Sequence, residues 1–84
     1  MLKIKDFVDL KELKKFGFKY IKENYNIREH YSLSKKTSRI TTELYAWVDC
    51  KDRFIYKGTW TEDSLYADIL FDLIQAGLVE KVER

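Results

Sequence analysis

The sequence predicts a small α+β domain in which two helices pack on one face of a mainly antiparallel sheet, in the order α-β-β-β-α-β. Apolar residues recur with a helical period near both ends of the chain and with a period of two between them. Each helical segment ends at a glycine that leads directly into a strand-like segment. The 84 residues leave room for one hydrophobic core, so residues 1–84 are interpreted as a single domain.

The first predicted helix begins at Asp9 and ends before Gly17. Asp9 and Glu12 have the spacing of a capping box, in which side chains bond the free amides of the first turn. Gly17 stands where a helix ends in a left-handed residue, and Phe18 beyond it can contact Leu13 as in a Schellman motif. The segment therefore carries its own start and stop signals.

The second predicted helix ends before Gly77 with the same pattern. Leu78 beyond the glycine can contact Leu73. Thr59 or Thr61 can cap its start, because a threonine hydroxyl accepts a bond from the amides of a first turn.

Segments with a period of two are predicted to be strands. Two hairpins are expected between the helices, and a short strand is expected before the first helix and after the second. Residues 34–39 contain no apolar side chain and predict a flexible loop. The predicted strands are residues 2–4, 18–23, 27–33, 40–49, 53–57 and 79–82.

The strand over residues 40–49 separates an aliphatic face from an aromatic face. The aliphatic face carries Ile40, Thr42, Leu44, Ala46 and Val48, and it is the predicted side for helix packing. A four-residue turn is favoured, because no glycine is present for a three-residue turn. This register pairs Tyr45 with Tyr56, Trp47 with Phe54 and Val48 with Arg53.

Aromatic residues are in excess, with six Tyr, five Phe and two Trp. A core of this size holds about half of them. The rest are expected on the second face of the sheet, at Tyr45, Trp47, Phe54 and Tyr56, extended by Tyr20 and Tyr31. Such a surface is typical of protein binding or self-association, for example as a homodimer. Cross-strand pairing that only stabilises the sheet explains the same pattern equally well.

Charge is distributed unevenly along the chain. Residues 1–42 carry eleven Lys and Arg against five Asp and Glu, whereas residues 43–84 carry five against nine. Lys35, Lys36 and Arg39 form a basic cluster that, with the aromatic face, is the basis of the alternative function, weak nucleic-acid binding. A pI near 8.6 is low for a dedicated nucleic-acid-binding protein.

The last helix and strand resemble those of winged-helix domains, but the central segment predicts strands where a helix-turn-helix is required.

Catalysis, cofactors and metals have little support. Cys50 lies between Asp49 and Asp52, whose charges disfavour a thiolate. His30 is interpreted as a solvated strand residue. One cysteine and one histidine build neither a disulfide nor a zinc site, so no cofactor is expected. The absence of an apolar run of about 18 residues and of a signal peptide predicts a cytoplasmic protein that does not bind membranes.

KELKKFGFKYIKENY, residues 11–25, and ILFDLIQAGLVEKV, residues 69–82, resemble segments of small uncharacterised proteins encoded by phages and prophages of Gram-positive bacteria. The resemblance implies a bacterial cytoplasmic setting and an accessory role. It supplies no catalytic residues. The functional prediction is therefore a non-enzymatic module that binds a protein or a second copy of itself.

Overall fold

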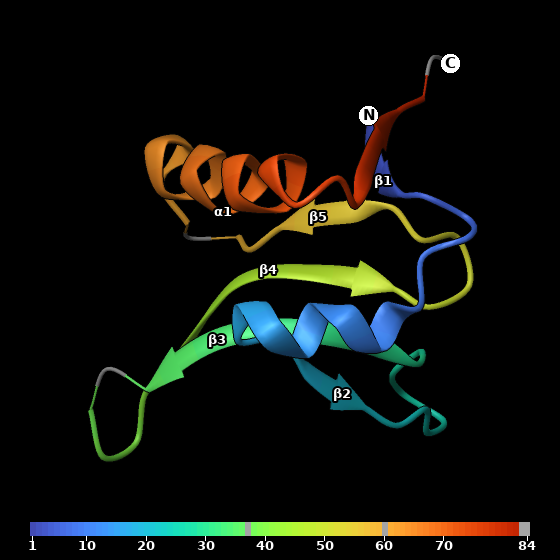
Figure 1. Cartoon of the computed structure of the whole chain (residues 1–84). Coiled ribbons are helices and arrows are strands. Elements are labelled where there is room, and N and C mark those ends of the chain that lie inside the picture. The colour runs from blue at the N-terminus through green and yellow to red at the C-terminus, as the bar shows by residue number, and fades with distance from the viewer. Residues whose placement is uncertain (37, 60, 83–84) are drawn as a thin grey trace.

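The computed structural model describes residues 1–36, 38–59 and 61–82, which form two helices and two antiparallel sheets (Figure 1). The α+β class is therefore confirmed. The predicted order is wrong by one strand, because all four segments with a period of two between the helices form strands. The elements are β1 (Leu2–Ile4), the 3₁₀ helix η1 (Leu10–Phe16), β2 (Lys19–Ile21), β3 (His30–Lys36), β4 (Thr42–Asp49), β5 (Ile55–Lys57), α1 (Asp63–Gln75) and β6 (Val79–Lys81).

Both helices end in the predicted Schellman motif. Gly17 has a φ of 92°, the Phe18 amide donates to the Leu13 carbonyl at 3.3 Å, and the glycine after α1 has a φ of 75°. The amide of Leu78 donates to the Leu73 carbonyl at 3.2 Å in the same way. These local signals fix the direction in which the chain leaves each helix.

The start of η1 is capped by Asp9, as predicted. Its carboxylate accepts a hydrogen bond from the Lys11 amide at 2.9 Å. The carboxylate of Glu12 lies 2.7 Å from Lys15 Nζ, one turn along the helix. The helix has 3₁₀ geometry, which proteins use in short pieces.

The predicted threonine cap of α1 is wrong. Glu62 occupies the cap position and makes no side-chain bond there. Neither Thr59 nor Thr61 is at the cap position. The hydroxyl of Thr61 instead donates to the carbonyl oxygens of Leu44 and Tyr45, each 3.1 Å away. Thr61 therefore ties the connection between β5 and α1 to strand β4.

The strands form two sheets instead of the one that was predicted. The larger sheet has the order β2-β3-β4-β5, and β1 pairs with β6 in the smaller one. An isolated bridge between Lys3 and Phe54 joins β1 to the beginning of β5. In the part of the chain that is described, neither helix has the length and apolar character needed to cross a membrane.

One cluster of buried side chains joins both helices to one face of the larger sheet. Leu13 of η1 and Ile69 and Leu73 of α1 belong to it, and Figure 1 shows η1 lying in front of β3. The sheet residues in this cluster are Tyr31, Ala46, Val48 and Ile55. We call this side of the sheet the core face and the opposite side the outer face.

The predicted register between β4 and β5 is wrong by two residues. Trp47 lies opposite Tyr56, and not opposite Phe54. Tyr45 consequently has no place opposite Tyr56. A shift of two leaves each side chain on its predicted face, whereas a shift of one would have reversed them all.

Arg53 accounts for this register. It adopts a left-handed conformation with φ 65°, so the turn needs no glycine and lies one residue later than predicted. Its guanidinium donates hydrogen bonds to the carbonyls of Lys5, at 2.8 Å, and Val8, while its own carbonyl accepts the Ile4 amide at 2.9 Å. These contacts hold the turn in a conformation that a non-glycine residue otherwise avoids.

The alternation of β4 is interrupted at Tyr45. Leu33 lies opposite Ala46 and Ser34 lies opposite Leu44, so Tyr45 is an extra residue in a β-bulge. Tyr45 packs against the core cluster, and Leu44 lines a groove together with Trp47. The predicted aliphatic face therefore continues only as far as Ala46.

Strands β3 and β4 continue beyond their neighbours as a two-stranded arm. Strand β2 pairs with β3 only as far as Ser32, and β5 pairs with β4 only as far as Ala46. We call the described residues 34–36 and 38–44 the arm, and Figure 1 shows it extending away from the rest of the molecule.

The loop predicted over residues 34–39 is wrong in its first half. Residues 34–36 belong to β3 and pair with residues 42–44. The turn is closed by Ser38, whose hydroxyl oxygen accepts the Thr41 amide at 3.1 Å. Thr37 lies outside the described residues.

Candidate interaction surface

Three rings form a continuous group on the outer face. Trp47 and Tyr56 stack with their centroids 4.3 Å apart and 20° between their planes. His30 meets Trp47 edge-on, with centroids 5.8 Å apart. None of the three packs against the core cluster, because the buried side chains of both helices lie on the core face. The outer face therefore presents an aromatic surface that neither helix covers.

A groove of about 460 Å³ lies beside this aromatic group. Its walls are mainly carbon: Ile27 is 45% exposed and Leu44 is 41% exposed, and one side is formed by Trp47. Polar groups are few, as in most binding pockets. The residues that line the groove are Asn26, Ile27, Arg28, His30, Leu44 and Trp47.

Arg28 is held at the groove by a buried carboxylate. Its Nη2 lies 2.9 Å from Asp49 Oδ2, and the Asp49 side chain is 2% exposed while that of Arg28 is 63% exposed. Asp49 Oδ2 also accepts the Asp52 amide at 3.0 Å. This contact fixes one nitrogen of the guanidinium, and most of the Arg28 side chain stays exposed to solvent.

His30 is oriented by the backbone. Its Nδ1 lies 2.7 Å from the Arg28 carbonyl oxygen, an acceptor that places the proton on Nδ1. Nε2 is then the ring nitrogen available to a ligand. Arg28 and His30 together give the groove one permanent cation and one hydrogen-bonding ring.

Two of the four predicted aromatic surface residues are in this group, and two are not. Trp47 and Tyr56 form the stack described above. Tyr45 is turned to the core side by the bulge. Phe54 is buried, with 8% of its surface exposed, where β1 bridges onto β5.

The predicted extension of the aromatic surface through Tyr20 and Tyr31 is also wrong. Tyr31 is buried in the core cluster, and Tyr20 lies opposite it on the same side of the sheet, with the two ring centroids 5.4 Å apart. Tyr31 lies opposite Val48, a core residue, and this register places its side chain on the core face and not on the predicted aromatic face.

The basic cluster of the sequence lies on the arm. Lys35 and Lys36 are in β3, Arg39 is in the turn, and all three are exposed. Within the described part of the chain, none of them forms an ion pair. They are therefore near one another but beyond the groove.

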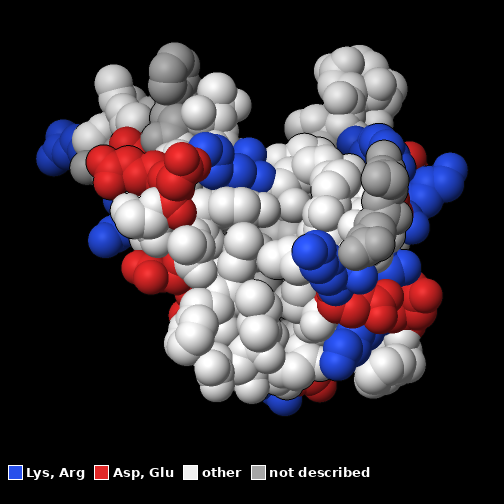
Figure 2. Space-filling view, turned by 90° about the horizontal axis from the view of Figure 1, so that it is seen from above, with Lys and Arg blue, Asp and Glu red and all other residues white. Residues whose placement is uncertain are grey.

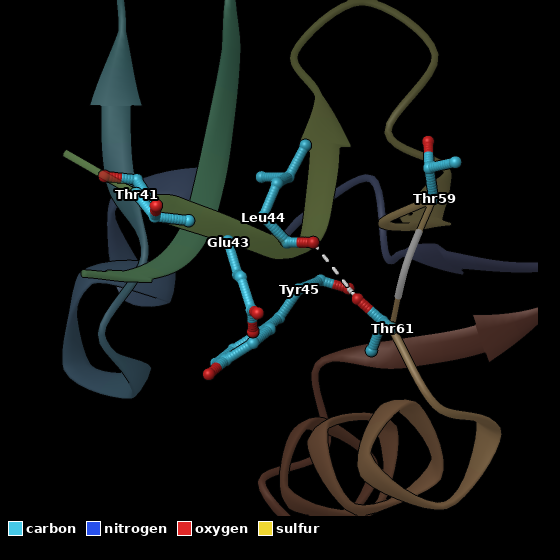
Figure 3. Close-up of a pocket in the computed structure, with 7 residues that line it drawn as sticks. Thr41, Glu43, Leu44, Tyr45, Thr59 and Thr61 are labelled. Carbon is cyan, nitrogen blue, oxygen red and sulfur yellow. Dashed lines mark hydrogen bonds between the residues drawn. The ribbon is translucent and has the colours of Figure 1, made fainter. Parts of the chain in front are cut away.

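A second pocket, of about 360 Å³, lies at the base of the arm (Figure 3). Thr61 contacts the backbone of Leu44 across it, as the dashed line shows. Gly58 stands close by, where a Cβ atom would lie 1.8 Å from the Leu44 carbonyl oxygen. Because Thr61 and Gly58 are used to hold the chain against β4, we assign this pocket a structural role.

Two titratable groups near Glu29 have raised pKa values. Burial, followed by the Glu29 carboxylate, raises the pKa of the Cys50 thiol to about 11. A hydrogen bond from the Tyr20 hydroxyl to Glu29 raises the pKa of Tyr20 to about 12. Both groups are protonated at neutral pH, which is unfavourable for a nucleophile. Among the described residues, no group of three or more His, Cys, Asp and Glu side chains is placed to hold a metal ion.

Ile27, Arg28 and Leu44 were not predicted as site residues, and His30 was predicted to be a solvated strand residue. Ile27 and Arg28 precede β3, and only the folding of that connection over the outer face brings them to Trp47. The one available signal was the alternation of Arg28 and His30, which places both on the same side of an extended segment.

Comparisons of the chain with protein-family models, with curated proteins and with solved structures found no match.

Proposed function

We propose that this chain is a non-enzymatic protein-binding module whose groove receives an apolar side chain from an acidic segment of a partner protein. The observation that carries the proposal is an apolar groove with an aromatic wall on a sheet face that neither helix covers. A cytoplasmic accessory role in a phage or prophage, which the resemblance at both ends of the chain implies, stays a prediction.

The chemistry of the groove supports a protein ligand. Trp, Tyr and Arg are the residues that contribute most to protein interfaces, and Trp47, Tyr56 and Arg28 lie together here. Ile27 and Leu44 offer exposed carbon surface that a partner side chain can cover. The exposed donors of Arg28 favour a carboxylate beside that side chain.

Nucleic-acid binding is less well supported. Trp47 and Tyr56 each use one ring face on the other, which leaves less ring surface for stacking on bases. The basic cluster of Lys35, Lys36 and Arg39 belongs to the arm and does not line the groove. Lys57, the basic residue at the end of β5, is paired with Asp63.

A random peptide library displayed on phage tests the proposal. We expect enriched peptides to combine one large apolar residue with Asp or Glu and to bind with a Kd in the micromolar range. In a Trp60→Phe background, Trp47 is the only tryptophan, so its fluorescence reports binding at the groove. Ile27→Asp should weaken binding at least about tenfold, because it places a carboxylate in the apolar wall.

Phe7→Asp is the matched control, since Phe7 is 84% exposed and does not line the groove. It should leave peptide affinity unchanged. The proposal would be overturned if no peptide were enriched, or if enriched peptides bound the Ile27→Asp variant as tightly as the wild type. A labelled single-stranded oligonucleotide that binds with a steep loss between about 50 and 200 mM salt would favour the nucleic-acid function in its place.

A further inference from the structure

The arm combines positive charge with an exposed apolar tip. Ile40, in its turn, is 96% exposed, and Lys35, Lys36 and Arg39 surround the turn in sequence. Glu43 is the one acidic residue among the described arm residues. Among the described residues, no strand pairs with the arm on either side, and Ile40 is not part of the core cluster.

The solvent-facing side of α1 has the complementary character. Phe71 is 58% exposed and Ile74 is 49% exposed, and they lie three residues apart on one side of the helix. Asp68 and Asp72 are exposed beside them, and α1 contains no Lys or Arg. Figure 2 looks down on the side of the molecule where α1 lies and shows a broad uncharged area with charged side chains on its flanks.

We propose that the arm of one copy docks on α1 of a second copy, with Ile40 against Phe71 and Ile74 and the basic arm residues facing Asp68 and Asp72. The arm is assigned to α1 because their charges are complementary. An acidic helix with an apolar strip favours a basic segment with an apolar tip, and the arm is such a segment. Lys35, Lys36, Arg39 and Ile40 do not line the groove, so this inference stands independently of the proposed function.

The arrangement of the molecule allows the contact to be reciprocal. The arm and the beginning of α1 both lie on the left side of Figure 1, and the arm points away from its own helix. In the proposed dimer, a two-fold axis relates the two copies, so that each arm contacts α1 of the other copy. Such a dimer is closed, because both complementary surfaces are used in both copies.

Charge reversal tests the contact on the whole chain. The wild-type protein should show a mass of twice 10.2 kDa by sedimentation equilibrium at high concentration, and less dimer as salt is raised. The arm variant, Lys35→Glu/Lys36→Glu/Arg39→Glu, and the helix variant, Asp68→Lys/Asp72→Lys, should each weaken the dimer at least about tenfold, because like charges then face each other. Circular dichroism checks that both variants are folded.

Mixing the two variants gives the decisive result. Each arm then faces a helix of opposite charge, so an arm variant and a helix variant should form a mixed dimer although neither dimerises alone. Lys11→Glu/Lys14→Glu/Lys22→Glu carries the same total charge as the arm variant and is the matched control. It should dimerise with itself like the wild type.

A wild-type protein that is monomeric at all concentrations would overturn the inference, and so would variants that dimerise normally or fail to pair when mixed. A dimer that only Ile27→Asp disrupts would place the second copy at the groove, which also contradicts this inference.

Discussion

The two faces of the larger sheet are built from the same strands but are covered differently. On the core face, Ala46 and Val48 are fully buried beneath side chains from both helices. On the outer face, Trp47 and Tyr56 are half-exposed: their rings stack, Trp47 meets the His30 ring edge-on, and the Tyr56 hydroxyl donates a hydrogen bond to Asp52 Oδ2 at 2.7 Å. The apolar residues of the core face are explained by packing against the helices. The large aromatic side chains of the outer face are not, because a sheet face exposed to solvent does not need them.

The contrast separates residues that stabilise the fold from residues that are available to a ligand. Leu44 and Ile27 are exposed on the outer face, so exchanging them should alter binding more than folding.

The same substitution on the two faces should have different costs. Leu73 is fully buried on the core side, and Leu73→Ala should lower the free energy of unfolding by about 3 kcal/mol because it leaves a cavity. Leu44 is 41% exposed, and Leu44→Ala should cost less than about 1 kcal/mol. Urea unfolding measures both, and similar losses would contradict the distinction between the faces.

The register that assigns side chains to these faces should depend on Arg53. Arg53→Ala should cost about 2 kcal/mol, since it removes the bonds to the Lys5 and Val8 carbonyls and keeps a left-handed residue with a Cβ atom. Arg53→Gly should cost about 1 kcal/mol less, because glycine adopts this conformation freely. Equal losses in urea unfolding would show that the left-handed conformation contributes nothing.

Local signals in the sequence predicted the local structure well. Gly17 and Gly77 end the helices as expected, because a left-handed residue and its two hydrogen bonds involve only neighbouring residues. Asp9 caps its helix for the same reason. The threonine cap failed because Thr61 finds carbonyl acceptors on a strand that is distant in sequence.

The candidate site depended on contacts that the sequence pattern does not contain. Trp47 and Tyr56 were placed on the correct face, but their pairing required the turn conformation of Arg53, which is held by a segment far from it in the chain. The bulge at Tyr45 interrupts the alternation of side chains along β4, so Tyr45 and Leu44 lie on the faces opposite to those predicted. Ile27 reached the groove through a connection whose path was not predictable.

The stack on the outer face should be measurable as a coupling energy. In a double-mutant cycle, Trp47→Ala and Tyr56→Ala should show a coupling of about 0.5 to 1.5 kcal/mol, as expected for a stacked aromatic pair. The control cycle combines Trp47→Ala with Tyr45→Ala. Because Tyr45 packs on the core side, that coupling should be near zero. A Trp47–Tyr45 coupling as large as the Trp47–Tyr56 coupling would show that Tyr45 lies on the outer face.

The smallest effect should come from the ion pair that joins the end of β5 to the first turn of α1. The Lys57 ammonium donates a hydrogen bond to Asp63 at 2.5 Å, and this bond and its charge lower the pKa of the Asp63 carboxyl below its usual 3.8. A carboxyl with a lowered pKa in the folded state stabilises the protein above its ordinary pKa, and that contribution is lost as the pH falls through the lowered value.

The difference in unfolding free energy between wild type and Asp63→Asn should therefore be constant near neutral pH and should decrease below about pH 4. It should be small, because the Asp63 side chain is 92% exposed and solvent screens the pair. Asp63 also lies at the helix N-terminus, which favours a negative charge without Lys57. Lys57→Met distinguishes the two causes: it should remove most of the pH dependence if the ion pair is responsible and leave it intact if the helix is.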